Sequence, residues 1–223
     1  RGPDGSPVAS PDGQLIAYIA GDEHRDTYRN QRIYVMNRDG TGSRLISGDY
    51  DRQSGGLRWA PDGSGLYFSV SREGYRGLHF VSLEGGVQRL TEGKQLLTMS
   101  SFSNRGLAVG TIVSAHEPGD LYQFDLDDPT NATRLTEVNT DVLHGVTLGD
   151  VEEIFYDSEP FSIQGWIVKP PDFDPSEKYP MMLAIHGGPH GMYNGGFNFA
   201  FQEHAANGYV VVYTNPRGST GYG

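Results

Sequence analysis

The sequence predicts two architectures in one chain: an all-β part built of repeats over residues 1–140, followed by the start of an α/β sheet over residues 141–223. Three observations carry this prediction. A short motif recurs every 45 residues, two apolar runs flank a helical segment near the carboxyl end, and 31 of the 223 residues are glycine. That glycine content is about twice the usual share and is typical of many short strands and tight turns.

The repeated motif is Arg-Leu followed by Ile or Thr. It begins at Arg44, Arg89 and Arg134, and two strand-like runs precede each copy. These runs cover residues 15–19 and 33–36, 66–70 and 78–81, and 107–113 and 121–124. A period near 45 made of short strands predicts the blades of a β-propeller, three of them in this chain.

A Pro-Asp-Gly turn precedes the first run in two of the three repeats. It occurs at Pro11-Asp12-Gly13 and at Pro61-Asp62-Gly63, and it suits a hairpin connection. The third copy has diverged to Phe-Ser-Asn-Arg-Gly at residues 102–106. Because a closed propeller needs roughly four to eight blades, we expect this chain to be the middle of a longer protein, cut at both ends.

The carboxyl-terminal part contains two consecutive apolar runs, residues 181–185 and 209–213. Runs of this kind predict parallel strands that are buried on both faces. Between them Asn198 is expected to cap a helix that ends with Gly208 at its C′ position. The active face of such a strand–helix–strand unit is the carboxyl end of its strands, where residues 186–189 lie.

The junction between the two parts is predicted to form an antiparallel strand pair, residues 151–156 and 163–168, at the outer edge of the sheet. Glu152 and Glu153 are interpreted as a solvated strand end and not as a ligand-binding pair. The polar segment 21–31 is likewise interpreted as an exposed hairpin loop.

Gly187 and Gly188 follow the first apolar run directly. Without Cβ atoms, their N–H groups can approach a substrate carbonyl oxygen and act as an oxyanion-hole donor. Gly188 is the first choice for this donor and Gly187 the second. The same two glycines also fit a plain turn between strand and helix.

Two motifs give the sequence a family resemblance. His186-Gly-Gly-Pro-His-Gly191, followed by Asn-Pro-Arg-Gly-Ser-Thr-Gly-Tyr-Gly at residues 215–223, resembles the start of the catalytic domain in the prolyl oligopeptidase family. The similarity is greatest to the branch of acylaminoacyl-peptidases and dipeptidyl aminopeptidases. The resemblance implies partial β-propeller blades followed by the amino-terminal part of an α/β-hydrolase domain, truncated before the nucleophile.

The resemblance also implies a catalytic Ser, Asp and His, which are expected outside residues 1–223. No Gly-x-Ser-x-Gly occurs in the chain, and Ser219 lacks that pattern because Arg217 stands where its first glycine would be. His186 is expected to hold the glycine loop by packing or hydrogen bonding, with Pro189 and His190 beside it. Arg217 is expected to anchor the loop after the second strand through hydrogen bonds.

The function that these expectations favour is a serine peptidase that hydrolyses short peptides, of acylaminoacyl- or dipeptidyl-peptidase type. This chain would supply one oxyanion-hole donor and part of the propeller gate, and residues 1–223 alone are expected to be inactive. Two alternatives stay open: a propeller-based binding or scaffold protein with an inert hydrolase segment, and a carboxylesterase.

Composition limits the partners. The net charge of −11 and the pI near 4.9 argue against nucleic acid and anionic membranes. No cysteine is present, and His186 and His190 have no carboxylate at ligand spacing, so neither a metal nor a cofactor is expected.

The expected partners are a short peptide substrate and the remainder of the same enzyme. Homo-oligomerisation is left open, as is the compartment: the cytoplasm is favoured, while a secreted or periplasmic location stays open because the native amino terminus is expected to be missing.

Overall fold

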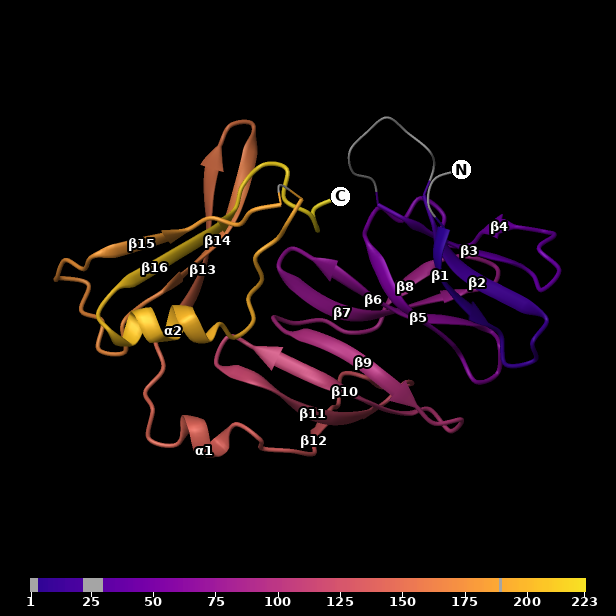
Figure 1. The fold of residues 1–223 in the computed structure, drawn as a ribbon, viewed down its shortest axis with the longest axis horizontal. Coiled ribbons are helices and arrows are strands. Elements are labelled where there is room, and N and C mark those ends of the chain that lie inside the picture. Colours follow the sequence, from indigo (N-terminus) through magenta and orange to yellow (C-terminus); the bar gives the residue numbers. More distant parts are fainter. Residues whose placement is uncertain (1–3, 22–29, 189) are drawn as a thin grey trace.

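The computed structural model describes residues 4–21, 30–188 and 190–223, and it is mostly β-sheet with two short helices in these ranges (Figure 1). Most of the predicted polar loop at residues 21–31 lies outside the described residues. The described strands form three consecutive four-stranded antiparallel units, which we call meanders, and one mixed sheet.

Each meander follows the chain strand by strand. The first contains β1 (Asp4–Ala9), β2 (Leu15–Ala20), β3 (Arg32–Asn37) and β4 (Arg44–Leu45). The second contains β5 (Ser54–Trp59), β6 (Gly65–Arg72), β7 (Tyr75–Ser82) and β8 (Val87–Arg89). The third contains β9 (Leu96–Phe102), β10 (Leu107–Ser114), β11 (Glu117–Asp125) and β12 (Thr133–Arg134), and a single parallel pairing of Arg76 with Leu96 joins it to the second. The six predicted strand runs are therefore confirmed as the second and third strands of each meander.

The turns that open the second strands are held by side-chain acceptors. Asp12 Oδ1 accepts hydrogen bonds from the Ser10 hydroxyl at 2.6 Å and the Gln14 amide at 3.0 Å. In the diverged third copy, the Ser103 hydroxyl accepts from the Leu107 amide at 3.2 Å. Ser103 thus acts as Ser10 does in the first turn, where the Ser10 hydroxyl accepts from the Leu15 amide at 2.9 Å, so the turn is kept although the Pro-Asp-Gly sequence is lost.

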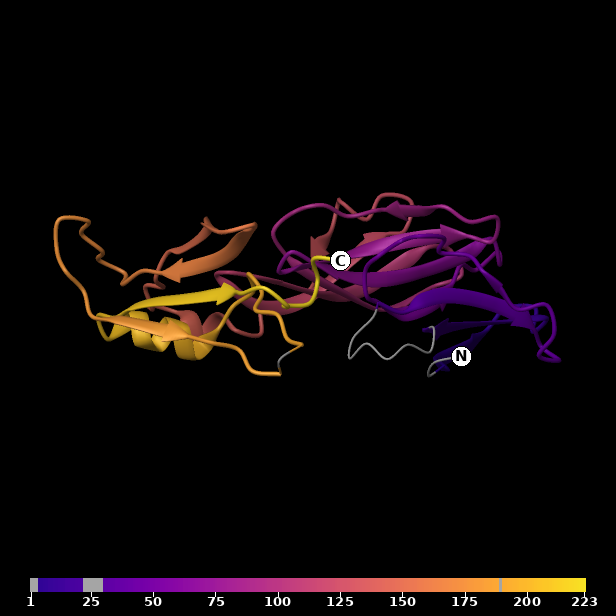
Figure 2. The same cartoon turned by 90° about the horizontal axis from the view of Figure 1, so that it is seen from above.

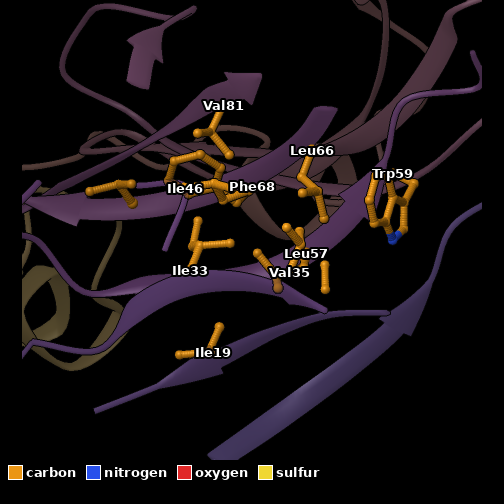
Figure 3. Close-up of a cluster of buried hydrophobic side chains, with 11 residues drawn as sticks. Ile19, Ile33, Val35, Ile46, Leu57, Trp59, Leu66, Phe68 and Val81 are labelled. Atoms are coloured by element: carbon orange, nitrogen blue, oxygen red, sulfur yellow. The ribbon is translucent and has the colours of Figure 1, made fainter. Parts of the chain in front are cut away.

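Successive meanders bury their apolar faces against each other. Figure 3 shows Ile19, Ile33 and Val35 of the first meander pointing toward Leu57 and Phe68 of the second. A second cluster lies over the third meander and includes the following residues: Leu78, Leu97, Ala108, Ile112, Phe124 and Leu126. Removal of this apolar surface from water is the main stabilising term, at about 25 cal/mol per Å².

The mixed sheet has the strand order β13 (Val151–Ser158), β14 (Phe161–Val168), β16 (Val210–Asn215), β15 (Met181–Ala184). β13 and β14 are antiparallel at one edge, as predicted, and β15 and β16 are parallel. α2 (Phe199–Ala206) connects the two parallel strands, and Asn198 Oδ1 caps it by accepting from the Phe201 amide at 3.1 Å. Gly208 follows with a φ of +83°, which confirms the predicted helix end. The short helix α1 (Thr140–Leu143), in the junction, was not predicted.

The prediction that both apolar runs are buried on both faces is wrong for β15. Met181, Leu183 and Ile185 are 63%, 55% and 74% exposed. The reason is that α2 covers only one face of the sheet, as Figure 2 shows, and the buried cluster of Trp166, Val211 and their neighbours forms on that face.

His79 is a buried titratable group in the second meander, only 3% exposed. Its ring lies against Phe68 and Tyr50, with centroid distances of 5.6 and 5.8 Å. Burial disfavours the charged imidazolium and lowers the pKa of His79 to about 4.

Protonation of His79 should make folding stability depend on pH. Below its ordinary pKa of about 6.5 the unfolded chain binds a proton that the folded chain excludes, so stability falls between about pH 6.5 and pH 4, by up to about 3 kcal/mol. We expect the His79→Phe variant to lose this slope in denaturant unfolding measured across that range. The exposed His144 offers the control: His144→Phe should keep the wild-type slope, and an unchanged slope in His79→Phe would contradict the assignment.

Candidate functional site

Two loops meet beyond the carboxyl ends of the parallel strands (Figure 1). The first loop, residues 186–191, follows β15, and the second loop, residues 215–223, begins at the last residue of β16. Two hydrogen bonds join them. The Thr220 amide donates to the Gly191 carbonyl oxygen at 2.9 Å, and His186 Nε2 lies 2.8 Å from Ser219 Oγ. The structure thus brings together the two segments that the sequence motifs singled out.

His186 is half-buried between the loops. Its ring packs edge-on against Tyr193, with a centroid distance of 5.5 Å, and Nδ1 lies 3.2 Å from the Gly187 carbonyl oxygen. The Ser219 hydroxyl also donates to the Pro216 carbonyl oxygen at 2.7 Å. Both the His186 imidazole and the Ser219 hydroxyl therefore have hydrogen-bond partners within the loops.

The two glycines differ in their surroundings. Gly188 has a φ of +139°, and a Cβ there would lie 2.9 Å from the His190 amide nitrogen, so a side chain at this position would be strained. A Cβ at Gly187 would meet no atom within 4 Å. Within the ranges that the structure describes, no hydrogen bond uses either glycine amide as its donor. Pro189 lies outside the described residues, and His190 is exposed.

Arg217 contacts an aromatic ring. The expected hydrogen bonds from its side chain are not found in the described part of the chain; instead its Cζ lies 5.9 Å from the centroid of Phe161, the first residue of β14. The exposed guanidinium thus links the second loop to the β13–β14 hairpin through a cation–π contact.

Asn215, which sequence reasoning missed, joins the second loop to Tyr193, two residues after the first loop. Its Oδ1 accepts from the Tyr193 amide at 2.7 Å, and its Nδ2 donates to the Tyr193 carbonyl oxygen at 3.0 Å and the Tyr222 hydroxyl at 2.8 Å. Asn215 is buried, so these bonds also satisfy its polar atoms.

The network continues through Gln164, which was also missed. The Tyr222 hydroxyl donates to Gln164 Oε1, and Gln164 Nε2 donates to the Glu73 carbonyl oxygen at 2.9 Å and to Glu153 Oε1 at 2.5 Å. Burial raises the pKa of Tyr222 to about 12, so its hydroxyl keeps its proton and remains a donor. In the sequence, only the position of Gln164 within the otherwise apolar run 163–168 indicated this network.

Glu153 corrects a further expectation. Its side chain is only 11% exposed and pairs with Lys94 Nζ at 2.6 Å. It therefore lies in the contact between the mixed sheet and the meanders and is not a solvated strand end. Glu152, in contrast, is exposed and pairs with Lys169 Nζ at 2.6 Å.

The turn between β6 and β7 of the second meander packs against the second loop. The Glu73 amide donates to the Gly221 carbonyl oxygen at 3.1 Å, and the Gly195 amide donates to the Gly74 carbonyl oxygen at 3.0 Å. A Cβ at Gly74 would lie 2.5 Å from the Trp166 ring. The site loops are therefore held in place by a meander more than a hundred residues earlier in the sequence.

Metal-binding clusters and membrane-spanning helices are absent from the described ranges. There, no group of three or more His, Cys, Asp or Glu side chains is close enough to hold a metal ion. No helix in these segments combines the length and hydrophobicity that crossing a membrane requires.

Comparison with known proteins gives consistent matches over this arrangement, although no protein-family model matches the chain. The uncharacterized peptidase YuxL of Bacillus subtilis is 34% identical over 184 residues, which cover 82% of this chain and 27% of that protein. A probable dipeptidyl-peptidase 5 of Aspergillus niger is 31% identical over 232 residues, covering 100% of this chain and 31% of that protein.

A solved structure agrees with these matches. The acylaminoacyl peptidase of Pyrococcus horikoshii is similar with a TM-score of 0.79 and 27% identity, over 95% of this chain and 32% of that one. The chain thus spans between 27% and 32% of the length of these relatives.

The Tyr222 hydroxyl is expected to be a major stabilising group of the second loop. In Tyr222→Phe the Nδ2 of Asn215 and the Oε1 of Gln164 each lose a partner in a buried setting, which should cost about 1–3 kcal/mol. We expect denaturant unfolding to show this loss. The Tyr209 hydroxyl forms no hydrogen bond in the described parts of the chain, so Tyr209→Phe is the matched control, and equal stability of the two variants would contradict the network.

Proposed function

This chain belongs to the prolyl oligopeptidase family of peptidases, and we propose that it is part of a serine peptidase that hydrolyses short peptides. The acylaminoacyl- or dipeptidyl-peptidase type is favoured, since relatives with these names match the chain over 95% to 100% of its length. The remainder of the enzyme is then the main partner of this segment.

In this proposal the three meanders, within residues 1–140, are blades of a β-propeller. The mixed sheet and α2, within residues 141–223, are the amino-terminal part of an α/β-hydrolase domain. Support comes from the face-to-face packing of the successive four-stranded meanders and from the parallel β15–α2–β16 unit. A propeller beside the site would restrict access to short or unfolded peptides.

The chemical role of this chain in the proposal is to stabilise negative charge. Gly188 N–H, with Gly187 N–H as the second choice, would donate to the carbonyl oxygen of the scissile bond as it becomes an oxyanion. One observation supports this role: Gly187 and Gly188 are exposed beyond the carboxyl end of β15, and their amides donate no hydrogen bond within the described residues. His186, His190, Arg217 and Pro189 would shape the loop around them.

The bond-breaking groups would come from the remainder of the enzyme. A serine hydroxyl attacks the carbonyl carbon, a histidine takes its proton and passes it to the leaving amine, and an aspartate orients the histidine. Ser219 is not assigned this role, because its hydroxyl donates its proton to the Pro216 carbonyl oxygen and not to His186, and because it lacks the Gly-x-Ser-x-Gly pattern. This chain thus completes one half of the oxyanion hole.

Replacement of Gly188 tests the proposal. In the full-length enzyme, Gly188→Ala forces a Cβ against the His190 amide and displaces the donor, so we expect kcat on an N-acetylated peptide to fall about 100- to 1000-fold. Gly208 at the end of α2 also has a positive φ, with open space around it, so Gly208→Ala carries the same kind of backbone strain. It should keep kcat within a few-fold of wild type.

Several outcomes would contradict the proposal. Equal kcat in Gly188→Ala and wild type would remove the oxyanion role. Turnover of p-nitrophenyl esters without turnover of acyl-peptides would favour a carboxylesterase. Turnover of neither, together with no labelling by a serine-directed reagent, would favour a binding protein.

A further inference from the structure

We propose that a cavity between the second and third meanders binds a carboxylate of the peptide substrate through Arg76, an inference that rests on the proposed peptidase function. The carboxylate has two sources in a peptide, its C-terminus or an Asp or Glu side chain. Arg76 would therefore favour acidic or short, free-ended substrates.

The cavity has a volume of about 410 Å³ and a largely polar lining. One wall is the face of the second meander, with Gly55 on β5 and Ser69 and Ser71 on β6. The opposite wall is β9 of the third meander, with Thr98 and Met99. The lining thus offers hydroxyls and backbone groups, which suit a small polar group.

Arg76 is the one charged residue of this lining. Its guanidinium donates to Thr98 Oγ1 at 3.0 Å and more weakly to Ser71 Oγ at 3.4 Å. Across the described residues no carboxylate lies within ion-pair distance of it, whereas Arg72, Arg89 and Arg134 each have one.

Arg76 is a half-buried guanidinium without a carboxylate partner among the described residues, in a chain of net charge −11. Such a group keeps several N–H donors available, and the planar guanidinium matches the two oxygens of a carboxylate. The two hydroxyls that hold Arg76 fix its orientation without neutralising its charge. The cavity is therefore set up for an anion supplied from outside.

The glycine in the cavity wall leaves room for that anion. A Cβ at Gly55 would meet no atom within 4 Å, and its backbone φ is not in the left-handed region. Neither the backbone conformation nor a neighbouring atom therefore excludes a side chain at residue 55. The glycine leaves this space open. A larger residue here would occupy the cavity.

The strands that line the cavity are connected to segments that contact the candidate site. Ser71 and Arg76 pair across the base of the β6–β7 turn, and the Glu73 amide in that turn donates to Gly221 of the second loop. The β5 wall follows Arg52, whose Nη1 would lie 2.7 Å from a Cβ at Gly223. The wall formed by the second meander therefore continues into segments that contact the loop 215–223.

The test compares three substrates of the full-length enzyme: N-acetyl-tetra-alanine with a free carboxylate, its carboxamide, and a carboxamide with Asp replacing one Ala. We expect wild type to prefer a carboxylate-bearing peptide by about tenfold or more in kcat/KM, as one charged hydrogen-bonded pair would give. In Arg76→Gln this ratio should fall to about one, and Gly55→Val should reduce it by filling the cavity. Preference for the free-ended peptide alone identifies the C-terminus, and preference for the Asp peptide alone identifies the side chain.

Arg58, exposed on the same strand β5, provides the matched control. Arg58→Gln makes the same change in net charge and should keep the wild-type ratio. A ratio near one in active wild type, or the same ratio in Arg76→Gln, would overturn the site. If wild type hydrolyses none of the peptides, the proposed function fails, and calorimetric binding of the same peptides tests the carboxylate site instead. Tighter binding of a carboxylate peptide, lost in Arg76→Gln, supports the site. Equal binding of all three peptides overturns the site.

Discussion

The position of the candidate site depends on the contact of the β6–β7 turn with the mixed sheet. Three backbone groups of this turn are satisfied from the other side: the Glu73 amide by Gly221, the Glu73 carbonyl by Gln164, and the Gly74 carbonyl by Gly195. The approach is close enough that Gly74 has no room for a Cβ against the Trp166 ring. Because two of these partners flank or belong to the site loops, the geometry of the loops follows from this contact.

The same contact determines the electrostatics behind the loops. Gln164 is 2% exposed, and its side-chain amide accepts from Tyr222 and donates to Glu153. The second oxygen of the Glu153 carboxylate pairs with Lys94. Burial raises the pKa of Tyr75 as well as that of Tyr222 to about 12, so both hydroxyls stay neutral. In a low-dielectric setting a fully bonded network of this kind holds one arrangement of the loops and penalises any that leaves a group unpaired.

The sequence predicted features that local chemistry determines. The strand-like runs ahead of each Arg-Leu motif located β2, β3 and their counterparts, Asn198 and Gly208 marked the ends of α2, and the two motifs located the site loops. The first strand of each meander was missed, because β1 and β5 contain glycine and polar residues, β9 contains a threonine and two serines, and all three have shifted registers. Gln164, Asn215 and Tyr222 were missed for another reason: their partners are brought together by the fold, up to 91 residues away in sequence.

Hydrogen–deuterium exchange in the full-length protein is the most direct test of this dependence. Gly74→Ala would push the β6–β7 turn away from Trp166, whereas Gly63→Ala, at another positive-φ glycine, would meet open space and serve as the control. We expect faster exchange over residues 186–191 and 215–223 in Gly74→Ala, with wild-type rates there in Gly63→Ala. Wild-type exchange of both loops in Gly74→Ala would contradict this dependence.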